Sequence, residues 1–182
     1  MRVLATAGKT YSSLLALALI WIYAQNRLRW TLFLPLNEER LARDLLIGLG
    51  VAVFVICLSL FASKNFLWAQ LLEDEFCKIL VPLPVWEIAA LALLSGLVEE
   101  ILFRGAIQPA FGLVSTSLLF GLAHIIPRRA FLPWSAYAVF AGFLFGSLFE
   151  LTHNLLPVIV AHSVSNFVLI LVLNRRKTMQ PA

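Results

Sequence analysis

The sequence predicts an all-α protein: a polytopic membrane bundle of about six transmembrane helices. Two observations support this. Of the 182 residues, 61% are apolar or aromatic and only 13% are charged, and the mean hydropathy is +0.91. Soluble domains are roughly 45–50% apolar and about 25% charged. A chain this short cannot bury such an excess inside a soluble core. The composition therefore excludes a soluble enzyme, a disordered chain and a nucleic-acid-binding module, and it predicts that the lipid bilayer surrounds most of the protein.

The length of the apolar runs gives the expected helices. A bilayer core of about 30 Å takes about 20 apolar residues as a helix. By this measure the sequence contains six candidate spans, at residues 12–24, 45–63, 85–110, 114–126, 134–151 and 155–173. The polar stretch 64–84 predicts a boundary between an N-terminal helix pair (residues 1–84) and a C-terminal core of four helices (85–174). A basic tail follows at residues 175–182.

The distribution of basic residues predicts the orientation. Six spans place both termini on one side of the membrane, and the side with more lysine and arginine faces the cytoplasm. The side of the termini carries Arg2, Lys9, Lys64, Lys78, Arg128, Arg129, Arg175, Arg176 and Lys177. The other side carries Arg27, Arg29, Arg40, Arg43 and Arg104. We therefore expect a multi-pass protein of the bacterial plasma membrane with both termini in the cytoplasm.

The third span contains charges that a membrane helix ordinarily excludes. Glu99, Glu100 and Arg104 follow directly on an apolar run. Each charge within a span costs on the order of 2.5–3.5 kcal/mol on insertion scales. Glu100 and Arg104 are four residues apart and can neutralise each other on one helix face. Glu99 has no such local partner, which makes it a candidate functional residue.

Helix geometry predicts that four polar side chains lie at a similar depth. If the chain turns at residues 111–112, Glu99 and His124 lie on opposite arms of a hairpin, each roughly 18–20 Å from the turn. The last span begins at a turn on the same side, which puts His162 roughly 12 Å and Asn166 roughly 18 Å into the membrane. His162 and Asn166 share a helix face because they are four residues apart. The sequence thus predicts that these four side chains converge from three helices.

This set of residue types suits peptide-bond hydrolysis within the membrane. Glu99 can take a proton from a water that attacks a peptide carbonyl, and His124 can hold that water or shuttle its proton. His162 and the Asn166 amide can donate hydrogen bonds to the developing oxyanion. Arg104, paired with Glu100, would hold the helix that carries the base.

Three motifs carry a resemblance to a known family. They are Glu99-Glu100-x-x-x-Arg104, then Phe120-x-x-x-His124, then His162-x-x-x-Asn166, in this order on successive apolar spans. The chain resembles the CPBP family of CAAX prenyl endopeptidases and bacteriocin-processing enzymes, also called glutamic-type intramembrane proteases, over about residues 85–174. The resemblance implies that Glu99 activates water with the help of His124, that Glu100 and Arg104 support it, and that His162 and Asn166 stabilise the oxyanion. It makes Phe120 a packing residue.

The resemblance also implies a membrane-associated substrate, either a protein cleaved near an embedded or lipidated C-terminal tail or a leader peptide. We expect no cofactor. Two alternatives stay open. Glu99, Glu100, His124 and His162 could hold zinc in a metalloprotease, although the sequence lacks the HExxH motif. The protein could instead be a non-enzymatic, immunity-type membrane protein that binds a peptide.

Overall fold

The computed structural model describes residues 2–27 and 37–178, and within them all regular secondary structure is helical. Arg29, one of the basic residues used to predict the orientation, lies outside these ranges. The elements in chain order are α1 (Arg2–Ala24), α2 (Glu38–Asn65), α3 (Leu67–Leu80), α4 (Val85–Glu100), the π-helix η2 (Ile101–Ile107), α5 (Gln108–Ala123), the 3-10 helix η3 (Arg129–Phe131), α6 (Leu132–Thr152) and α7 (Leu156–Thr178). The predicted all-α bundle is confirmed.

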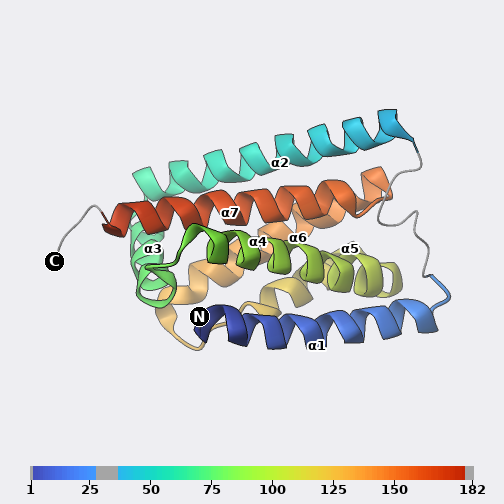
Figure 1. The fold of residues 1–182 in the computed structure, drawn as a ribbon, viewed down its shortest axis with the longest axis horizontal. Coiled ribbons are helices and arrows are strands. Elements are labelled where there is room, and N and C mark those ends of the chain that lie inside the picture. The colour runs from blue at the N-terminus through green and yellow to red at the C-terminus, as the bar shows by residue number, and fades with distance from the viewer. Residues whose placement is uncertain (1, 28–36, 179–182) are drawn as a thin grey trace.

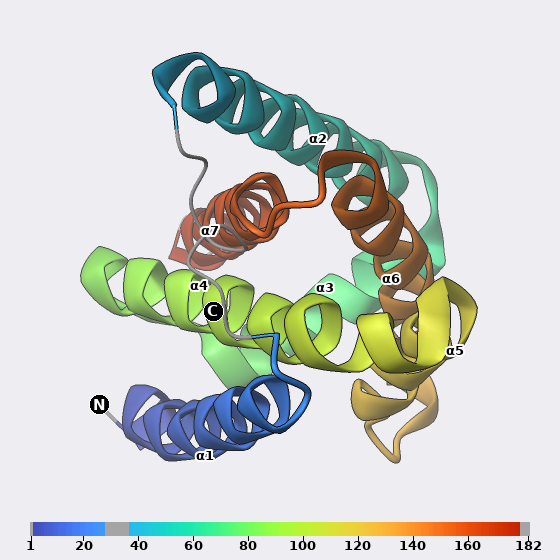
Figure 2. The ribbon, with the colours of Figure 1, turned by 90° about the vertical axis from the view of Figure 1, so that its right-hand side faces the viewer.

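Helix α7 lies at the centre of the bundle. It packs against α2 on one side and α4 on the other, while α1 covers the opposite side of α4 and η2 (Figures 1 and 2). Helix α5 packs against α6. The beginning of α1 and the end of α7 lie toward the same end of the bundle, on the left in Figure 1.

The count of six full-length spans is not reproduced. Among the residues that the structure describes, four helices are long and apolar enough to cross a membrane, and a fifth candidate is the bent pair of α3 with the segment that runs from α4 to α5. The difference arises where residues 85–110 and 114–126 were expected to be separate spans. The second arm is helical only to Ala123. From residue 113 onward it is therefore about 16 Å long, which is too short for a 30 Å bilayer core.

The stretch 64–84, from which the sequence predicted only a polar boundary, is largely helical. It contains α3, which meets the next helix at a bend of 110°. Ala69, Leu72 and Phe76 recur at helical spacing and turn toward the cavity described below. Glu73 lies on the same face and also lines the cavity, and it accepts a hydrogen bond from Arg176 Nη1 at 2.6 Å. Because acidic residues 73–75 are consecutive, the sequence of this stretch did not indicate the amphipathic helix that it forms.

The predicted reversal at residues 111–112 is present. Gly112 has φ +78°, a left-handed conformation that glycine adopts without a steric penalty. Beyond Gly112 the chain runs back along η2, so that the ring centroids of Phe103 and Phe120 lie 4.8 Å apart. On the outer side of the reversal, Trp21 of α1 packs edge-on against Phe111 with ring centroids 6.1 Å apart. This reversal brings the end of α5 to the level of the end of α4.

Candidate active site

Two consecutive glutamates end α4 in the interior of the bundle. Glu99 is 8% exposed and Glu100 is fully buried. The π-helix η2 follows immediately and carries Arg104, which is also fully buried. Short π-helical turns within α-helices are rare and are frequently found at functional sites. The unexpected charges therefore lie within and directly before the segment with the unusual backbone.

Glu99 faces two imidazole rings. Its Oε2 lies 3.6 Å from His124 Nε2 and 4.0 Å from His162 Nε2. This oxygen is buried and has no hydrogen-bond partner among the described residues. The two distances exceed direct hydrogen-bond length and are of a size that a bridging water spans. The structure therefore brings Glu99, His124 and His162 together, as the depth estimate predicted.

The other nitrogen of each ring is already engaged. His124 Nδ1 lies 2.7 Å from the Phe120 carbonyl oxygen, and His162 Nδ1 lies 2.7 Å from Glu100 Oε1. A carbonyl and a carboxylate oxygen accept hydrogen bonds, so each Nδ1 is the protonated, donating nitrogen. In the neutral form of either ring, Nε2 then carries the lone pair. Both rings are oriented so that Nε2 faces Glu99.

Glu100 neutralises the buried guanidinium. Arg104 Nη1 lies 3.1 Å from Glu100, and Arg104 Nη2 donates to the Gly142 carbonyl oxygen at 3.1 Å. The guanidinium also lies over the Phe120 ring, 4.7 Å from its centroid. The ion pair that the spacing predicted is present. In addition, Glu100 holds His162, a contact between α4 and α7 that the local spacing could not reveal.

Phe120 is the apolar centre of this group. It is 2% exposed, and its ring centroid lies 4.5 Å from that of His124 and 6.2 Å from that of His162. Its ring therefore supports both imidazoles and the Arg104 guanidinium at once. This geometry agrees with the packing position that the motif implied for it.

Asn166 lies one helical turn further along α7 than His162 and is half-buried. Its Nδ2 donates to Ser95 Oγ at 3.0 Å, and Ser95 Oγ donates to the Ala92 carbonyl oxygen at 3.1 Å. Ser95 lies one turn before Glu99 on α4. The Asn166 amide has a second N–H, which this contact leaves available. Asn166 forms no hydrogen bond with Glu99 or either histidine among the described residues, but it lines the same cavity.

The site includes one residue that was not predicted from the sequence. Tyr11 of α1 donates a hydrogen bond from its hydroxyl to Glu99 Oε1 at 2.8 Å. The residue belongs to the N-terminal helix pair, where no charged group marked a functional face. Apolar periodicity gives a helix and its length, but it does not give the axial register between two helices that are distant in sequence. No signal in the sequence therefore pointed to Tyr11.

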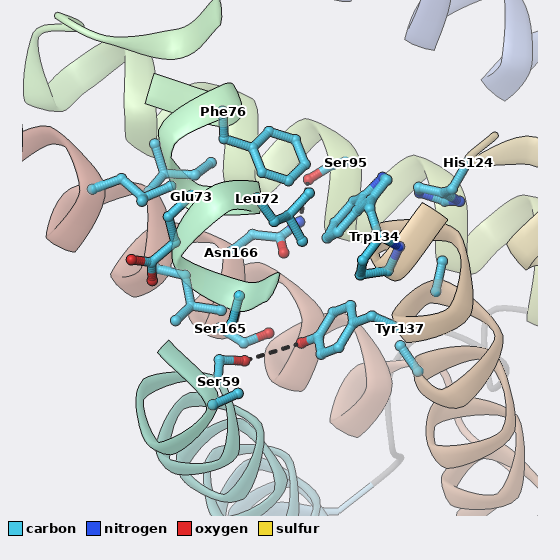
Figure 3. A pocket seen from close by; sticks show the side chains of 18 of the residues that line it. Ser59, Leu72, Glu73, Phe76, Ser95, His124, Trp134, Tyr137, Ser165 and Asn166 are labelled. Atoms are coloured by element: carbon cyan, nitrogen blue, oxygen red, sulfur yellow. Dashed lines mark hydrogen bonds between the residues drawn. The ribbon is translucent and has the colours of Figure 1, made fainter. Parts of the chain in front are cut away.

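These residues line a cavity of about 900 Å³. Apart from the site residues, its walls are mainly apolar side chains from α2, α3, α6 and α7. Figure 3 shows Asn166 beside Ser95 on one part of the wall and His124 beside Trp134 on another. The hydroxyl oxygens of Ser59 and Tyr137 lie 3.5 Å apart and link α2 to α6 (Figure 3). The cavity connects the buried carboxylate to an apolar space large enough for several side chains.

The site contains residue types that bind metal ions in other proteins. Within residues 2–27 and 37–178, no group of three or more His, Cys, Asp or Glu side chains has the spacing to hold a metal ion. Glu99, His124 and His162 come nearest in chemistry, since an oxygen and two ring nitrogens face one another. Glu100, the fourth residue of the zinc alternative, is instead engaged with Arg104 and His162.

Comparison with known proteins identifies the family. The model of the family "Type II CAAX prenyl endopeptidase Rce1-like" matches residues 81–168. A relative from Bacillus subtilis (strain 168), "Uncharacterized protein YpbD", is 32% identical over 135 residues, which cover 72% of this chain and 69% of the relative. The chain belongs to the CPBP family. No solved structure matches it.

The family is one of intramembrane proteases that act on membrane-associated proteins. Together with the four to five candidate spans, membership makes this chain an integral membrane protein of a CAAX-type peptide hydrolase family. The matched segment contains all seven site residues predicted from the sequence: Glu99, Glu100, Arg104, Phe120, His124, His162 and Asn166. It does not contain Tyr11.

Proposed function

We propose that the protein is a glutamic-type intramembrane endopeptidase in which Glu99 activates the attacking water. One observation carries the proposal: Glu99 Oε2 lies buried and without a hydrogen-bond partner among the described residues, 3.6 Å from His124 Nε2 and 4.0 Å from His162 Nε2. A water bound between Glu99 Oε2 and His124 Nε2 donates one proton to each. Its oxygen lone pair is then free to attack a carbonyl carbon.

The first step forms a tetrahedral intermediate. The water oxygen bonds to the carbonyl carbon, one water proton moves to Glu99 Oε2, and the carbonyl oxygen becomes an oxyanion. The available N–H of Asn166 donates to this oxyanion. His162 donates from Nε2 when both of its ring nitrogens carry protons, with Glu100 accepting from Nδ1. Preorganised donors of this kind are the largest contribution to many acyl-transfer reactions.

The second step breaks the peptide bond. Glu99 returns the proton to the amide nitrogen, the carbon–nitrogen bond breaks, and the amine product leaves. Glu99 is then ready for the next water. Glu100 and Arg104 do not touch the reacting atoms in this scheme. They hold His162 and the η2 segment in place through the contacts of Glu100 with His162 and with Arg104. The opposite charges of Glu100 and Arg104 cancel, so that both can lie inside the bundle.

The cavity supports an apolar substrate. Its volume of about 900 Å³ is in the upper part of the usual range for ligand pockets, about 300–1,000 Å³. An α-helix with side chains has a diameter of about 10–12 Å, so that only a short stretch of intact helix fits such a volume. We therefore propose that the substrate presents an extended apolar segment, near a membrane-embedded or lipidated C-terminal tail or in a leader peptide.

Zinc-dependent cleavage is the second candidate for the same residues. It is favoured by the orientation of the two rings, since Nε2 of His124 and of His162 both face Glu99 Oε2. An imidazole lone pair and a carboxylate oxygen are groups that zinc accepts. We propose the metal-independent mechanism, because the described residues offer no three-membered group with metal spacing. The sensitivity of cleavage to a chelator separates the two candidates.

We further propose that both termini face the cytoplasm of a bacterial cell. Lys64, Lys78 and Arg176 belong to the ends of α2, α3 and α7 that lie together at one end of the bundle. Basic residues favour the cytoplasmic side. A reporter fused to the C-terminus that is active only in the cytoplasm tests this orientation.

Co-expression with candidate substrates tests the proposed function. Tagged membrane proteins with apolar C-terminal tails are expressed with the wild-type protein or with Glu99→Gln, which keeps the size of the side chain and removes the base. The proposal predicts a shortened product with the wild type only, and co-purification of uncleaved substrate with Glu99→Gln. If Glu99→Gln preserves the biological effect and no product forms with either protein, the non-enzymatic peptide-binding alternative is correct.

A further inference from the structure

Glu99 has two carboxylate oxygens with different surroundings. Oε2 faces the two imidazoles, whereas Oε1 accepts the hydrogen bond from the Tyr11 hydroxyl at 2.8 Å. Among the described residues, Tyr11 is the only group whose side chain donates a hydrogen bond to Glu99. The orientation of the carboxylate plane therefore depends on a residue of α1. We infer that Tyr11 is a positioning residue that fixes the Glu99 carboxylate so that Oε2 points at the water site; this inference rests on the proposed function.

Tyr11 differs from its polar neighbours on α1. The hydroxyl groups of Thr10 and Ser13 donate back to carbonyl oxygens of their own helix, to Thr6 at 3.2 Å and to Lys9 at 3.1 Å. Those contacts satisfy the hydroxyl groups locally. Tyr11 instead donates across to α4 and also lines the cavity. Its hydroxyl thus has a role between helices that its neighbours lack.

The packing of α1 fixes the depth of Tyr11. Further along the helix, Ala18 and Ile22 are fully buried in the core that also contains residues of η2. Trp21 contacts Phe111 at the reversal. These contacts determine how far α1 is advanced along α4 and η2. They therefore hold the Tyr11 hydroxyl at the level of Glu99.

A single hydrogen bond of this kind has a kinetic consequence. An unbound carboxylate can rotate about its terminal torsion, which is broad and roughly two-fold. A base that is misdirected for part of the time lowers the rate of the chemical step without changing the contacts that hold the substrate. Loss of the Tyr11 hydroxyl therefore lowers kcat and leaves KM nearly unchanged. The donor comes from outside residues 81–168, so the matched family segment does not supply it.

The test compares Tyr11→Phe with Tyr23→Phe in the full-length protein reconstituted in vesicles. Tyr23 lies on the same helix and is 72% exposed, so its variant controls for the loss of a hydroxyl from α1. The readouts are kcat and KM for a tail-containing substrate, together with the thermal unfolding midpoint. We expect Tyr11→Phe to lower kcat about tenfold or more, with KM within about twofold and an unchanged midpoint. Tyr23→Phe is expected to match the wild type.

Three results would overturn the assignment. The first is a wild-type kcat for Tyr11→Phe. The second is a raised KM with an unchanged kcat, which would make Tyr11 a substrate contact. The third is a lower rate that is fully explained by a lowered unfolding midpoint of the variant. Glu99→Gln is measured in parallel. If Glu99→Gln is inactive while Tyr11→Phe keeps the wild-type kcat, the proposed function stands and the positioning role fails. If Glu99→Gln keeps wild-type activity, the proposed function itself fails.

Discussion

His162 donates from Nδ1 to Glu100 Oε1 at 2.7 Å, so that the glutamate next to Glu99 orients one of the rings that face Glu99. Two neighbouring carboxylates thus have different surroundings. Glu99 keeps one oxygen without a partner among the described residues, while Glu100 is engaged with His162 and Arg104. Because the two carboxylates have different surroundings, we expect Glu99→Gln and Glu100→Gln to lower the activity to different extents.

Glu100→Gln is expected to reduce activity less than Glu99→Gln. The amide oxygen can still accept from His162 Nδ1, so the ring orientation is partly kept, whereas removal of a general base costs about 10²–10⁴ in rate. Measurement of kcat for both variants with one substrate checks this order. Equal losses would contradict the supporting role of Glu100.

The buried ion pair of Glu100 and Arg104 predicts how substitutions in it change the stability of the protein. Arg104→Met leaves the Glu100 carboxylate without its buried countercharge, and breaking a buried pair in this way costs about 3–5 kcal/mol. Combining Arg104→Met with Glu100→Gln removes both charges and is expected to restore part of the lost stability. Thermal unfolding midpoints in one detergent provide the comparison. A double variant less stable than Arg104→Met would contradict this account of the pair.

Asn166 is expected to act at the oxyanion. Asn166→Asp keeps the shape of the side chain but removes the amide donor, and loss of one such donor costs about 10²–10³ in kcat. We expect a loss of that size with little change in KM. A variant with normal kcat and a raised KM would show that Asn166 binds the substrate in the ground state instead.

Close packing of α4 against α7 is required to bring the site together. A Cβ at Gly96 would lie 2.1 Å from Ser163 Oγ and 2.7 Å from the Ser163 backbone nitrogen. Gly96→Ala therefore forces the helices apart, with an expected cost of about 1–3 kcal/mol and a loss of activity. Gly50→Ala on α2 is the matched control, because nothing lies within 4 Å of its added Cβ. Equal behaviour of the two variants would contradict the packing argument.

Metal dependence gives a further prediction. If Glu99 activates water without a metal ion, incubation of the purified protein with a strong chelator leaves the cleavage rate unchanged. Cleavage assays before and after chelation, with zinc added back, measure this directly. Activity that is lost on chelation and restored by zinc would establish the metalloprotease alternative.

Part of the fold and site could be predicted because helix geometry converts sequence distance into depth. A reversal at Gly112 places Glu99 and His124 at one level, and their side chains lie 3.6 Å apart. The Glu100–Arg104 pair follows from a spacing of four residues. Both relationships are local or depend on a single tight turn, so the rise per residue is enough to find them.

The remaining contacts of the site depend on tertiary packing, which the spacing of residues along the sequence does not encode. The contact of Tyr11 with Glu99 requires the register of α1 against α4, and the contact of Glu100 with His162 requires the rotation of α7. The helix α3 was missed because its three consecutive acidic residues, two of which pair with Arg176 and Lys78, resemble a polar connector. The count of six spans failed because the arm after Gly112 is too short to cross a membrane alone.

The most direct test is the cleavage rate of the purified protein in vesicles, measured with a tailed substrate for the wild type, Glu99→Gln and Glu38→Gln. Glu38 is an exposed carboxylate in the first turn of α2 and controls for the change of charge. We predict a rate for Glu99→Gln at least about 10² below the wild type, with a normal rate for Glu38→Gln and an unchanged affinity for the uncleaved substrate. A Glu99→Gln protein that cleaves at the wild-type rate would contradict the claim that this carboxylate activates the water.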